Sequence, residues 1–319
     1  MRNTQSVAID VKHLARRFGE FVAVNDVTFQ VRTGEIFGFL GSNGAGKSTT
    51  IRMLCGLLRP SSGTAVVGGI DVAADPEGVK RRIGYMSQRF SLYELLTVDQ
   101  NIRFFGGVYG LSAEQLERRR AFVIEMAGLR GREHSLARDL AGGWRQRLAL
   151  GCAILHEPAI LFLDEPTGGV DPLSRRQFWR LIDALASSGV AILVTTHYLD
   201  EAERCHRVTL IHAGRLAAIG TIAEVKRVFA GRPIVEVRTT RPIDTMEVLD
   251  AMPVVEKTSL FGTAVHAVLN TSAVQVASIA DQLKARGIPA DSIERVDPSL
   301  EDVFLDVVER AEAQPSVAS

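Results

Sequence analysis

Gly41-Ser42-Asn43-Gly44-Ala45-Gly46-Lys47-Ser48-Thr49 matches the pattern G-x-x-x-x-G-K-[ST] at every fixed position. The apolar run at residues 35–40 predicts a buried strand before it. Residues 50–58, apolar at helical spacing and followed by Arg59-Pro60, predict a helix after it. The glycines let successive backbone N–H groups point at one anion, and the helix start adds partial positive charge at the same place. The stretch therefore predicts a phosphate-binding loop.

Two side chains of this loop have predicted roles. Lys47 is expected to reach the β- and γ-phosphates as a point charge, and Ser48 is expected to offer its hydroxyl to Mg²⁺. A chance glycine-rich turn is the alternative interpretation. The strand and helix patterns on its two sides favour phosphate binding over that alternative.

The composition bounds the partners and the compartment. The chain has 319 residues, enough for one large domain and a small one. Its 37 Lys and Arg balance its 37 Asp and Glu, which argues against a protein that coats nucleic acid, so no nucleic-acid partner is expected. The three cysteines form no C-x-x-C pair. They are interpreted as reduced thiols of a cytosolic protein, two of them in the core.

The sequence gives no sign of direct insertion into a membrane. No apolar run approaches the roughly 18 residues that a spanning helix needs. The first ten residues lack the apolar core of a signal peptide. Any role at a membrane is therefore expected to depend on a partner.

Outward from the loop, the chain alternates between strand and helix patterns. Alternating apolar and polar residues predict two antiparallel strands at Val7–Leu14 and Val27–Val31. From Phe90 to Leu140 the pattern is helical, and from Ala159 buried strands and helices alternate again. This order predicts a mostly parallel sheet covered by helices, with an antiparallel β part and a helical insertion.

Two carboxylates, Asp164 and Glu165, follow the predicted buried strand Ile160–Leu163. In open α/β sheets, ligands bind outside the carboxyl ends of the strands, where the phosphate-binding loop also lies. Asp164 is expected to hold Mg²⁺, directly or through water, and Glu165 to act on the attacking water as a general base. An acidic pair without a function is the alternative, and the neighbouring loop argues against it.

A histidine and a glutamine end other predicted strands of the same sheet. His197 follows the strand at Val190–Val194, where it can contact a γ-phosphate and hold the attacking water. Gln88 follows the strand at Ile83–Ser87 and leads into the helical insertion. It can therefore bridge Mg²⁺ to that insertion.

A second glycine pair, Gly142-Gly143, opens a predicted helix at Trp144–Leu155. The N–H groups at a helix start bind anions, so the chain has two predicted phosphate sites. One nucleotide held between two molecules, by the loop of one and the helix start of the other, would account for both sites.

Taken in order, these motifs resemble the working parts of an ABC transporter ATPase. Phe18 matches the family's adenine-stacking residue, Gly41–Thr49 matches Walker A, and Gln88 matches the Q-loop. Further along, the signature is at Leu140–Trp144, Walker B at Ile160–Glu165, the D-loop at Gly168–Asp171 and the switch histidine at His197. The resemblance covers about residues 7–220. A finer likeness, to exporter ATPases of the multidrug and daunorubicin-resistance type, rests on Tyr85-Met86-Ser87-Gln88, residues 196–202 and residues 300–304.

The resemblance implies a P-loop NTPase fold with ATP and Mg²⁺ as cofactors. It implies that Glu165, His197 and Gln88 are catalytic and that Ser48, Gln88 and Asp164 hold the metal. It assigns nucleotide contacts to Phe18, Gly41, Ser42, Asn43, Gly44, Ala45, Gly46, Lys47, Ser48, Thr49, Ala141, Gly142, Gly143 and Asp171. The implied partners are integral-membrane permease subunits and a second ATPase subunit, identical or different. These partners would place the chain at the cytoplasmic face of the cell membrane.

The signature departs from the family pattern, which is usually Leu-Ser-Gly-Gly-Gln. Here Ala141 replaces the serine and Trp144 replaces the glutamine. The family's serine would contact the γ-phosphate across the dimer, and alanine forgoes that contact. Phe18 stands where tyrosine is common, which leaves stacking on adenine intact.

The C-terminal part has its own pattern. From Pro233 it is strand, helix, strand, strand, helix, strand and helix, and the first six follow the split β-α-β order of a ferredoxin-like fold. We predict an ABC ATPase domain at residues 1–222, with a helical subdomain at about 89–155. A small α+β domain follows at 223–311, with a regulatory, dimer-contact or purely structural role. A disordered tail is predicted at 312–319.

The predicted function is ATP hydrolysis that powers export of a drug-like or other amphipathic substrate through a separate permease. Residues 89–96 are expected to line a docking groove for the permease, with core packing as the alternative. A soluble ABC ATPase acting on the ribosome or DNA is the alternative function, although a lone cassette without a long coiled coil argues against it. A regulator that binds ATP without hydrolysing it is a third hypothesis, opposed by Glu165, Gln88 and His197.

Overall fold

The computed structural model describes residues 6–88 and 92–313 of the chain. They divide at Thr221 into two compact units, Met1–Thr221 and Ile222–Ser319. The division falls one residue before the end of the predicted ATPase domain. The first three residues of the segment expected to dock a permease, 89–91, lie outside the described residues.

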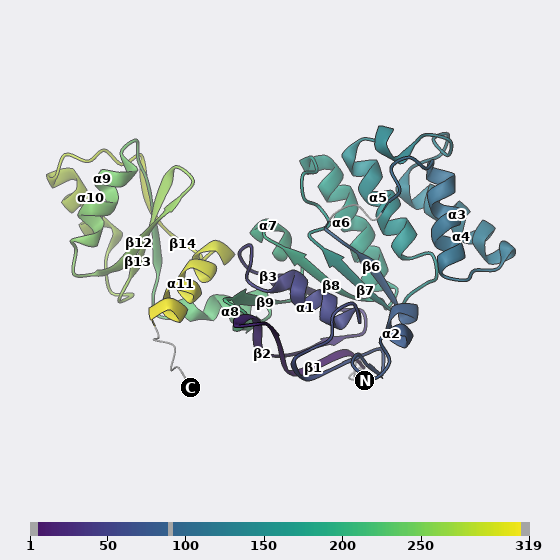
Figure 1. The fold of residues 1–319 in the computed structure, drawn as a ribbon. Coiled ribbons are helices and arrows are strands. Elements are labelled where there is room, and N and C mark those ends of the chain that lie inside the picture. Colours follow the sequence, from purple (N-terminus) through teal and green to yellow (C-terminus); the bar gives the residue numbers. More distant parts are fainter. Residues whose placement is uncertain (1–5, 89–91, 314–319) are drawn as a thin grey trace, which may run out of the picture. The chain divides into compact units, whose positions relative to one another are not determined.

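The first unit is built around a mostly parallel sheet (Figure 1). Within the described residues its strand order is β10-β9-β3-β8-β7-β6, and the neighbouring strands from β9 to β6 run parallel, while β10 is antiparallel to β9. Every residue of β3 and β8 is buried, as expected of strands covered on both faces. The bounds are β3 Ile36–Leu40, β6 Ile83–Met86, β7 Ile160–Asp164, β8 Ala191–Thr196, β9 Arg207–His212 and β10 Arg215–Gly220.

The same unit contains an antiparallel sheet that packs on the parallel one, with the order β2-β1-β4-β5. Its strands are β1 Val7–Phe18, β2 Phe21–Arg32, β4 Ser62–Val67 and β5 Ile70–Asp71. β1 and β2 are longer than predicted. Register shifts after Val11 form bulges that break the alternation of apolar and polar residues, so the alternation marks only part of each strand. Phe29 of β2 stacks on Phe37 of β3 with ring centroids 5.3 Å apart, which joins the two sheets in one core.

Helices cover the sheet and form the predicted insertion. Figure 1 shows α3, α4 and α5 together beyond β6. The helices of this unit are α1 Lys47–Leu54, α2 Pro76–Arg82, α3 Val98–Val108, α4 Ala113–Ala127, α5 Gly142–Ala153, α6 Pro172–Ser187 and α7 Leu199–Ala202. Throughout the described ranges, every helix is too short or too polar to cross a membrane.

All three cysteines of the chain are buried, one more than predicted. Cys55 caps the C-terminal end of α1, and Cys152 lies in α5. Cys205 lies beneath β3, where a Cβ built on Gly38 would come within 2.9 Å of the cysteine Sγ. Burial raises the pKa of each thiol above its ordinary value.

The second unit has the predicted ferredoxin-like topology. Its sheet has the order β12-β13-β11-β14, and each pair of neighbours is antiparallel. Helix α11 continues to Ala313, two residues past the predicted end of the domain, and residues 314–319 lie outside the description. The bounds are α8 Ile222–Lys226, β11 Ile234–Arg238, α9 Pro242–Asp250, β12 Val255–Phe261, β13 Ala264–Leu269, α10 Val276–Ala285, β14 Ser292–Val296 and α11 Leu300–Ala313.

A buried histidine joins α11 to the sheet of the second unit. His266 of β13 is 3% exposed. Its Nδ1 lies 2.8 Å from Asp302 Oδ1 of α11, and its Nε2 lies 3.3 Å from Glu236 Oε2 of β11. Burial would lower the pKa of His266, but the bonds to Asp302 and Glu236 outweigh it and raise the pKa. Burial would raise the pKa of Asp302, but the hydrogen bonds from His266 and Ser299 outweigh it and lower the pKa.

We expect the second unit to lose stability as the pH rises through the neutral range. The pKa of His266 is raised above 6.5 in the fold, so its protonated form stabilises fully below that value and less as the pH passes the raised pKa. Asp302 affects stability at low pH instead. Its pKa is lowered below 3.8 in the fold, so its charged form stabilises the unit above that value and the stabilisation is lost as the pH falls through the lowered pKa. Hydrogen exchange of the β13 amides in the full chain, corrected for intrinsic rates, measures the effect.

His266→Gln is the matched control for this test, because it keeps a donor and does not titrate. The variant should lose the decline in protection above pH 6.5 that is expected of the wild type. The same pH profile in both proteins would contradict the role of His266.

Candidate functional site

The predicted phosphate-binding loop connects β3 to α1, and two of its glycines are required by close packing. A Cβ built on Gly41 would meet the carbonyl oxygen of Ile211, at the end of β9, at 2.4 Å. A Cβ on Gly46 would meet the carbonyl oxygen of Ala23, in β2, at 2.6 Å, and Gly46 has a φ of +106°. The loop is therefore fixed between the two sheets, while Ser42, Asn43 and Gly44 at its tip are exposed.

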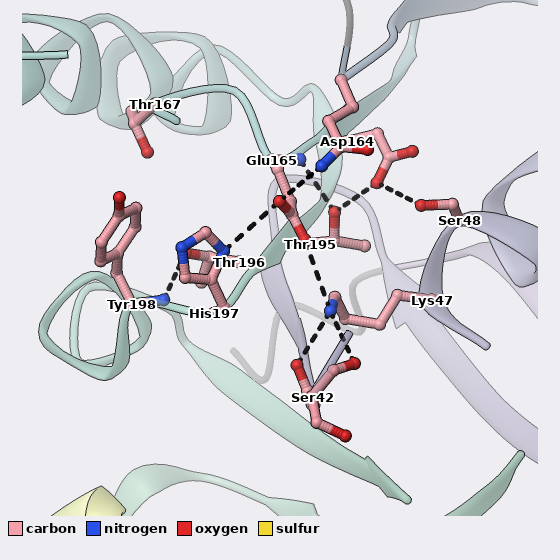
Figure 2. Close-up of polar contacts among 12 residues, drawn as sticks. Ser42, Lys47, Ser48, Asp164, Glu165, Thr167, Thr195, Thr196, His197 and Tyr198 are labelled. Carbon is pink, nitrogen blue, oxygen red and sulfur yellow. Dashed lines mark hydrogen bonds and ion pairs between the residues drawn. The ribbon is translucent and has the colours of Figure 1, made fainter. Parts of the chain in front are cut away.

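Lys47 is turned back onto its own loop, as Figure 2 shows. Its side chain is 4% exposed. The Nζ atom donates to the carbonyl oxygens of Gly41, at 2.8 Å, and Ser42, at 3.1 Å. It also lies 3.4 Å from Glu165 Oε1, so the lysine charge is paired with a carboxylate at the end of β7.

Ser48 and Asp164 present oxygen atoms side by side. Ser48 Oγ donates to Asp164 Oδ1 at 3.1 Å, and Thr195 Oγ1 donates to the same oxygen at 2.7 Å. Carboxylate and hydroxyl oxygens suit Mg²⁺, which keeps several waters and is held by few protein ligands. Within the described chain, no group of three or more His, Cys, Asp or Glu is placed to hold a metal ion.

Glu165 is where the predicted catalytic side chains meet (Figure 2). Its Oε2 accepts a hydrogen bond from Gln88 Nε2 at 2.9 Å and lies 3.3 Å from His197 Nδ1. With Lys47 on Oε1, the carboxylate has three partners, which come from the start of α1 and from the segments after β6 and β8. The structure thus brings Gln88, Lys47 and His197 together around Glu165.

The backbone of Glu165 is strained. Its φ is +48°, a left-handed conformation that is uncommon for residues other than glycine. Its backbone N–H donates to Thr195, to Oγ1 at 2.9 Å and to the carbonyl oxygen at 3.2 Å. Such strain persists when the surroundings fix the residue, and it is concentrated at functional sites.

Four predicted residues lie at helix starts away from this cluster. Ala141 is the N-cap of α5 without a side-chain cap bond, and space is open around a Cβ on Gly142. A Cβ on Gly143 would meet Ser174 Oγ of α6 at 2.3 Å. Asp171 caps α6 by accepting from the Ser174 N–H at 3.0 Å. The structure thus joins the starts of α5 and α6, and their nucleotide contacts remain predictions.

The remaining predicted contacts belong to the loop and to β1. Phe18 ends β1, is 46% exposed and carries the Arg16 guanidinium 4.5 Å from its ring centroid. Ala45 is buried, and Thr49 is half-buried in α1. Sequence reasoning missed Thr195, although two threonines at the end of a buried strand, directly before His197, are a recognisable polar signal.

Comparisons with known proteins agree with the motif order. The model of the ABC transporter family matches residues 24–168, and that of the DrrA1-3-like ATP-binding protein C-terminal domain matches residues 220–308. The probable multidrug ABC transporter ATP-binding protein YbhF of Escherichia coli is 50% identical over 218 residues, 68% of this chain. This chain spans 38% of the length of YbhF.

Other similarities extend further along the chain. The Nod factor export ATP-binding protein I of Cupriavidus metallidurans is 35% identical over 305 residues, covering 95% of this chain and 97% of that protein. A solved structure described as the ATP binding subunit of an ABC transporter is 35% identical, with a TM-score of 0.64, and covers 70% of this chain and 93% of that one.

Replacing Gly46 by alanine should destabilise the chain more than replacing Gly44. Both glycines have positive φ, which costs an alanine about 1–2 kcal/mol. Gly46→Ala adds a clash with the Ala23 carbonyl, roughly another 1–3 kcal/mol. Gly44 has open space around its Cβ position and is the matched control. Urea unfolding of both variants measures the difference, and equal losses would contradict this packing argument.

Proposed function

The chain belongs to the family of ABC transporter ATP-binding proteins, and we propose that it binds and hydrolyses ATP with Mg²⁺ to power an exporter. One observation carries the proposal. The Glu165 carboxylate is held at once by Lys47, Gln88 and His197, beside the oxygen pair of Ser48 and Asp164. This set supplies a base, a phosphate-binding cation and oxygen ligands for a metal.

The charge of Lys47 links phosphate binding to the freeing of the base. Lys47 now neutralises Glu165 across 3.4 Å and is bonded to two loop carbonyls. Phosphate oxygens carry more negative charge than one carboxylate and compete for the lysine. When Lys47 turns to them, it leaves Oε1 of Glu165, which is then open to accept a proton from water.

Gln88 and His197 would then orient the base and the water. Both touch Oε2 of Glu165 and come from opposite sides of β7, since β6 precedes Gln88 and β8 precedes His197. Ser48 and Asp164 would hold Mg²⁺, which neutralises charge on the phosphate oxygens. The ring of Phe18 is exposed and accessible for stacking on an adenine.

A second ATPase subunit, identical or different, is part of the proposal. The start of α5 packs on α6 through Gly143, while the space beside Gly142 is open. N–H groups at such a helix start bind anions. They are proposed to serve the nucleotide on the opposite subunit.

Permease subunits in the membrane are the other proposed partners, which would hold the chain at the cytoplasmic face. Tyr93, Leu95 and Phe104 are 50%, 72% and 41% exposed, and the Tyr93 and Phe104 rings lie 4.5 Å apart. Exposed aromatic clusters of this kind suit a protein interface. The transported substrate is proposed to be drug-like or amphipathic, because YbhF is named a probable multidrug transporter protein.

The two other hypotheses receive less support. The relatives described above are named for transport, which does not favour a soluble ATPase acting on the ribosome or DNA. A regulator that binds ATP without hydrolysing it has no need of Gln88 and His197 around Glu165.

Glu165→Gln should keep ATP binding and stop hydrolysis, because the amide preserves the shape and removes the base. Lys47→Ala should lose both, because it removes the cation for the phosphates. Binding of a fluorescent ATP analogue and steady-state phosphate release, measured on the full chain, separate the two effects. Wild-type turnover in either variant would overturn the proposed function.

Ala141→Ser should accelerate hydrolysis or tighten an ATP-bound dimer. A serine hydroxyl on a phosphate oxygen is worth roughly 1.5–3 kcal/mol. That corresponds to about ten- to a hundredfold in rate if it is felt fully in the transition state. The serine can also cap α5, which now lacks a side-chain cap. In a heterodimer the change should affect the partner's site. Unchanged hydrolysis and unchanged ATP affinity would show that a hydroxyl at this position has no role.

A further inference from the structure

A buried carboxylate lies directly behind the site, on α7. Glu201 is 1% exposed. Its Oε1 accepts from Thr167 Oγ1 at 2.6 Å, and its Oε2 accepts from Thr196 Oγ1 at 2.9 Å. Arg175 Nε of α6 lies 3.2 Å from Oε1. A buried charge is costly unless it is paired and hydrogen-bonded, so these partners are what make Glu201 tolerable there.

The two threonines attach Glu201 to both sides of the Glu165–His197 contact. Thr167 follows Glu165 by two residues, and the Gly168 N–H closes the turn between them by donating to the Glu165 carbonyl at 3.3 Å. Thr196 directly precedes His197, and its Oγ1 also accepts from the Tyr198 N–H at 3.0 Å. The backbone on each side of the 3.3 Å contact is therefore tied to one carboxylate.

The same carboxylate is connected to the start of α6. The Arg175 guanidinium lies 4.1 Å from the ring centroid of Tyr198 and 3.7 Å from Asp200. Arg175 directly follows Ser174, against which Gly143 of α5 packs. If the starts of α5 and α6 moved, the side chain of Arg175 would transmit the movement to Glu201.

We propose that Glu201 is a positioning residue that sets the geometry of Glu165 and His197 and links it to the start of α6. The inference rests on the proposed function. Glu201 is buried behind β8 and acts through Thr167, Thr196 and Arg175. Its loss should therefore lower the rate of the chemical step and leave ATP affinity unchanged.

Glu201→Gln in the full chain tests this proposal. The amide fills the same volume, loses the ion pair and must turn a donor toward one of the two hydroxyls. We expect kcat to fall about tenfold, as for a lost hydrogen bond to a charged group, with KM and ATP-analogue affinity unchanged. Glu201→Asp, which keeps the charge on a shorter stem, should recover part of the rate.

Glu35→Gln is the matched control. Glu35 is also buried, at 4% exposure, pairs with Arg207 and accepts from the Arg32 N–H, but it lies just before the first residue of β3, at the opposite end of the sheet. Both amide variants should lose stability, and kcat per folded molecule should fall in Glu201→Gln alone. An equal fall in both, or none in Glu201→Gln, would overturn the proposal.

Two smaller changes keep the test decisive if Glu201→Gln does not fold. Thr167→Val and Thr196→Val each remove one hydroxyl and leave the Arg175 pair in place. Each should lower kcat without changing KM, and wild-type kcat in both would overturn the role of Glu201. An absence of ATP hydrolysis by the wild type, in contrast, would be a failure of the proposed function itself.

Discussion

Thr195 is the residue on which the geometry of the site depends. Its hydroxyl donates to Asp164 Oδ1 and accepts from the Glu165 N–H, whose hydrogen is shared with the Thr195 carbonyl. These bonds fix the carboxylate of Asp164 and the left-handed backbone of Glu165. Since β7 and β8 are parallel neighbours, with Asp164 directly opposite Thr195, the contact follows from sheet register and needs no flexible loop to form.

The sequence was sufficient to predict the sheet, the phosphate-binding loop and the placement of Gln88, Glu165 and His197 at one edge, because strand ends of a parallel sheet share that edge. It did not predict that Gln88, Lys47 and His197 all contact the Glu165 carboxylate. It was not sufficient for β1 and β2, where register shifts after Val11 hide the alternation. Nor could it reveal the bonds of Thr195, which depend on which strand lies beside β7. Strand order is a tertiary property, and the alternation of strands and helices leaves it open.

The second unit is organised by buried charges on one side of its sheet. Val235, Val265 and Ala267 face an apolar core with α9 and α10. On the other side α11 contributes two carboxylates: Asp302, which pairs with His266 of β13, and Asp306, which is 1% exposed and pairs with Arg232 and Lys257. A shift of α11 would leave one of these buried charges without its partner, which is strongly destabilising.

The buried thiols have a consequence for how opening of this chain can be followed. Cys55, Cys152 and Cys205 lie at the end of α1, within α5 and beneath β3, so each thiol is protected by a different part of the first unit. A protected, protonated thiol reacts with an alkylating reagent chiefly through local or global unfolding. The rates at which the three thiols are alkylated should therefore report separately on the opening of three regions. Cys55 reports on α1, Cys152 on the helical insertion and Cys205 on the central sheet.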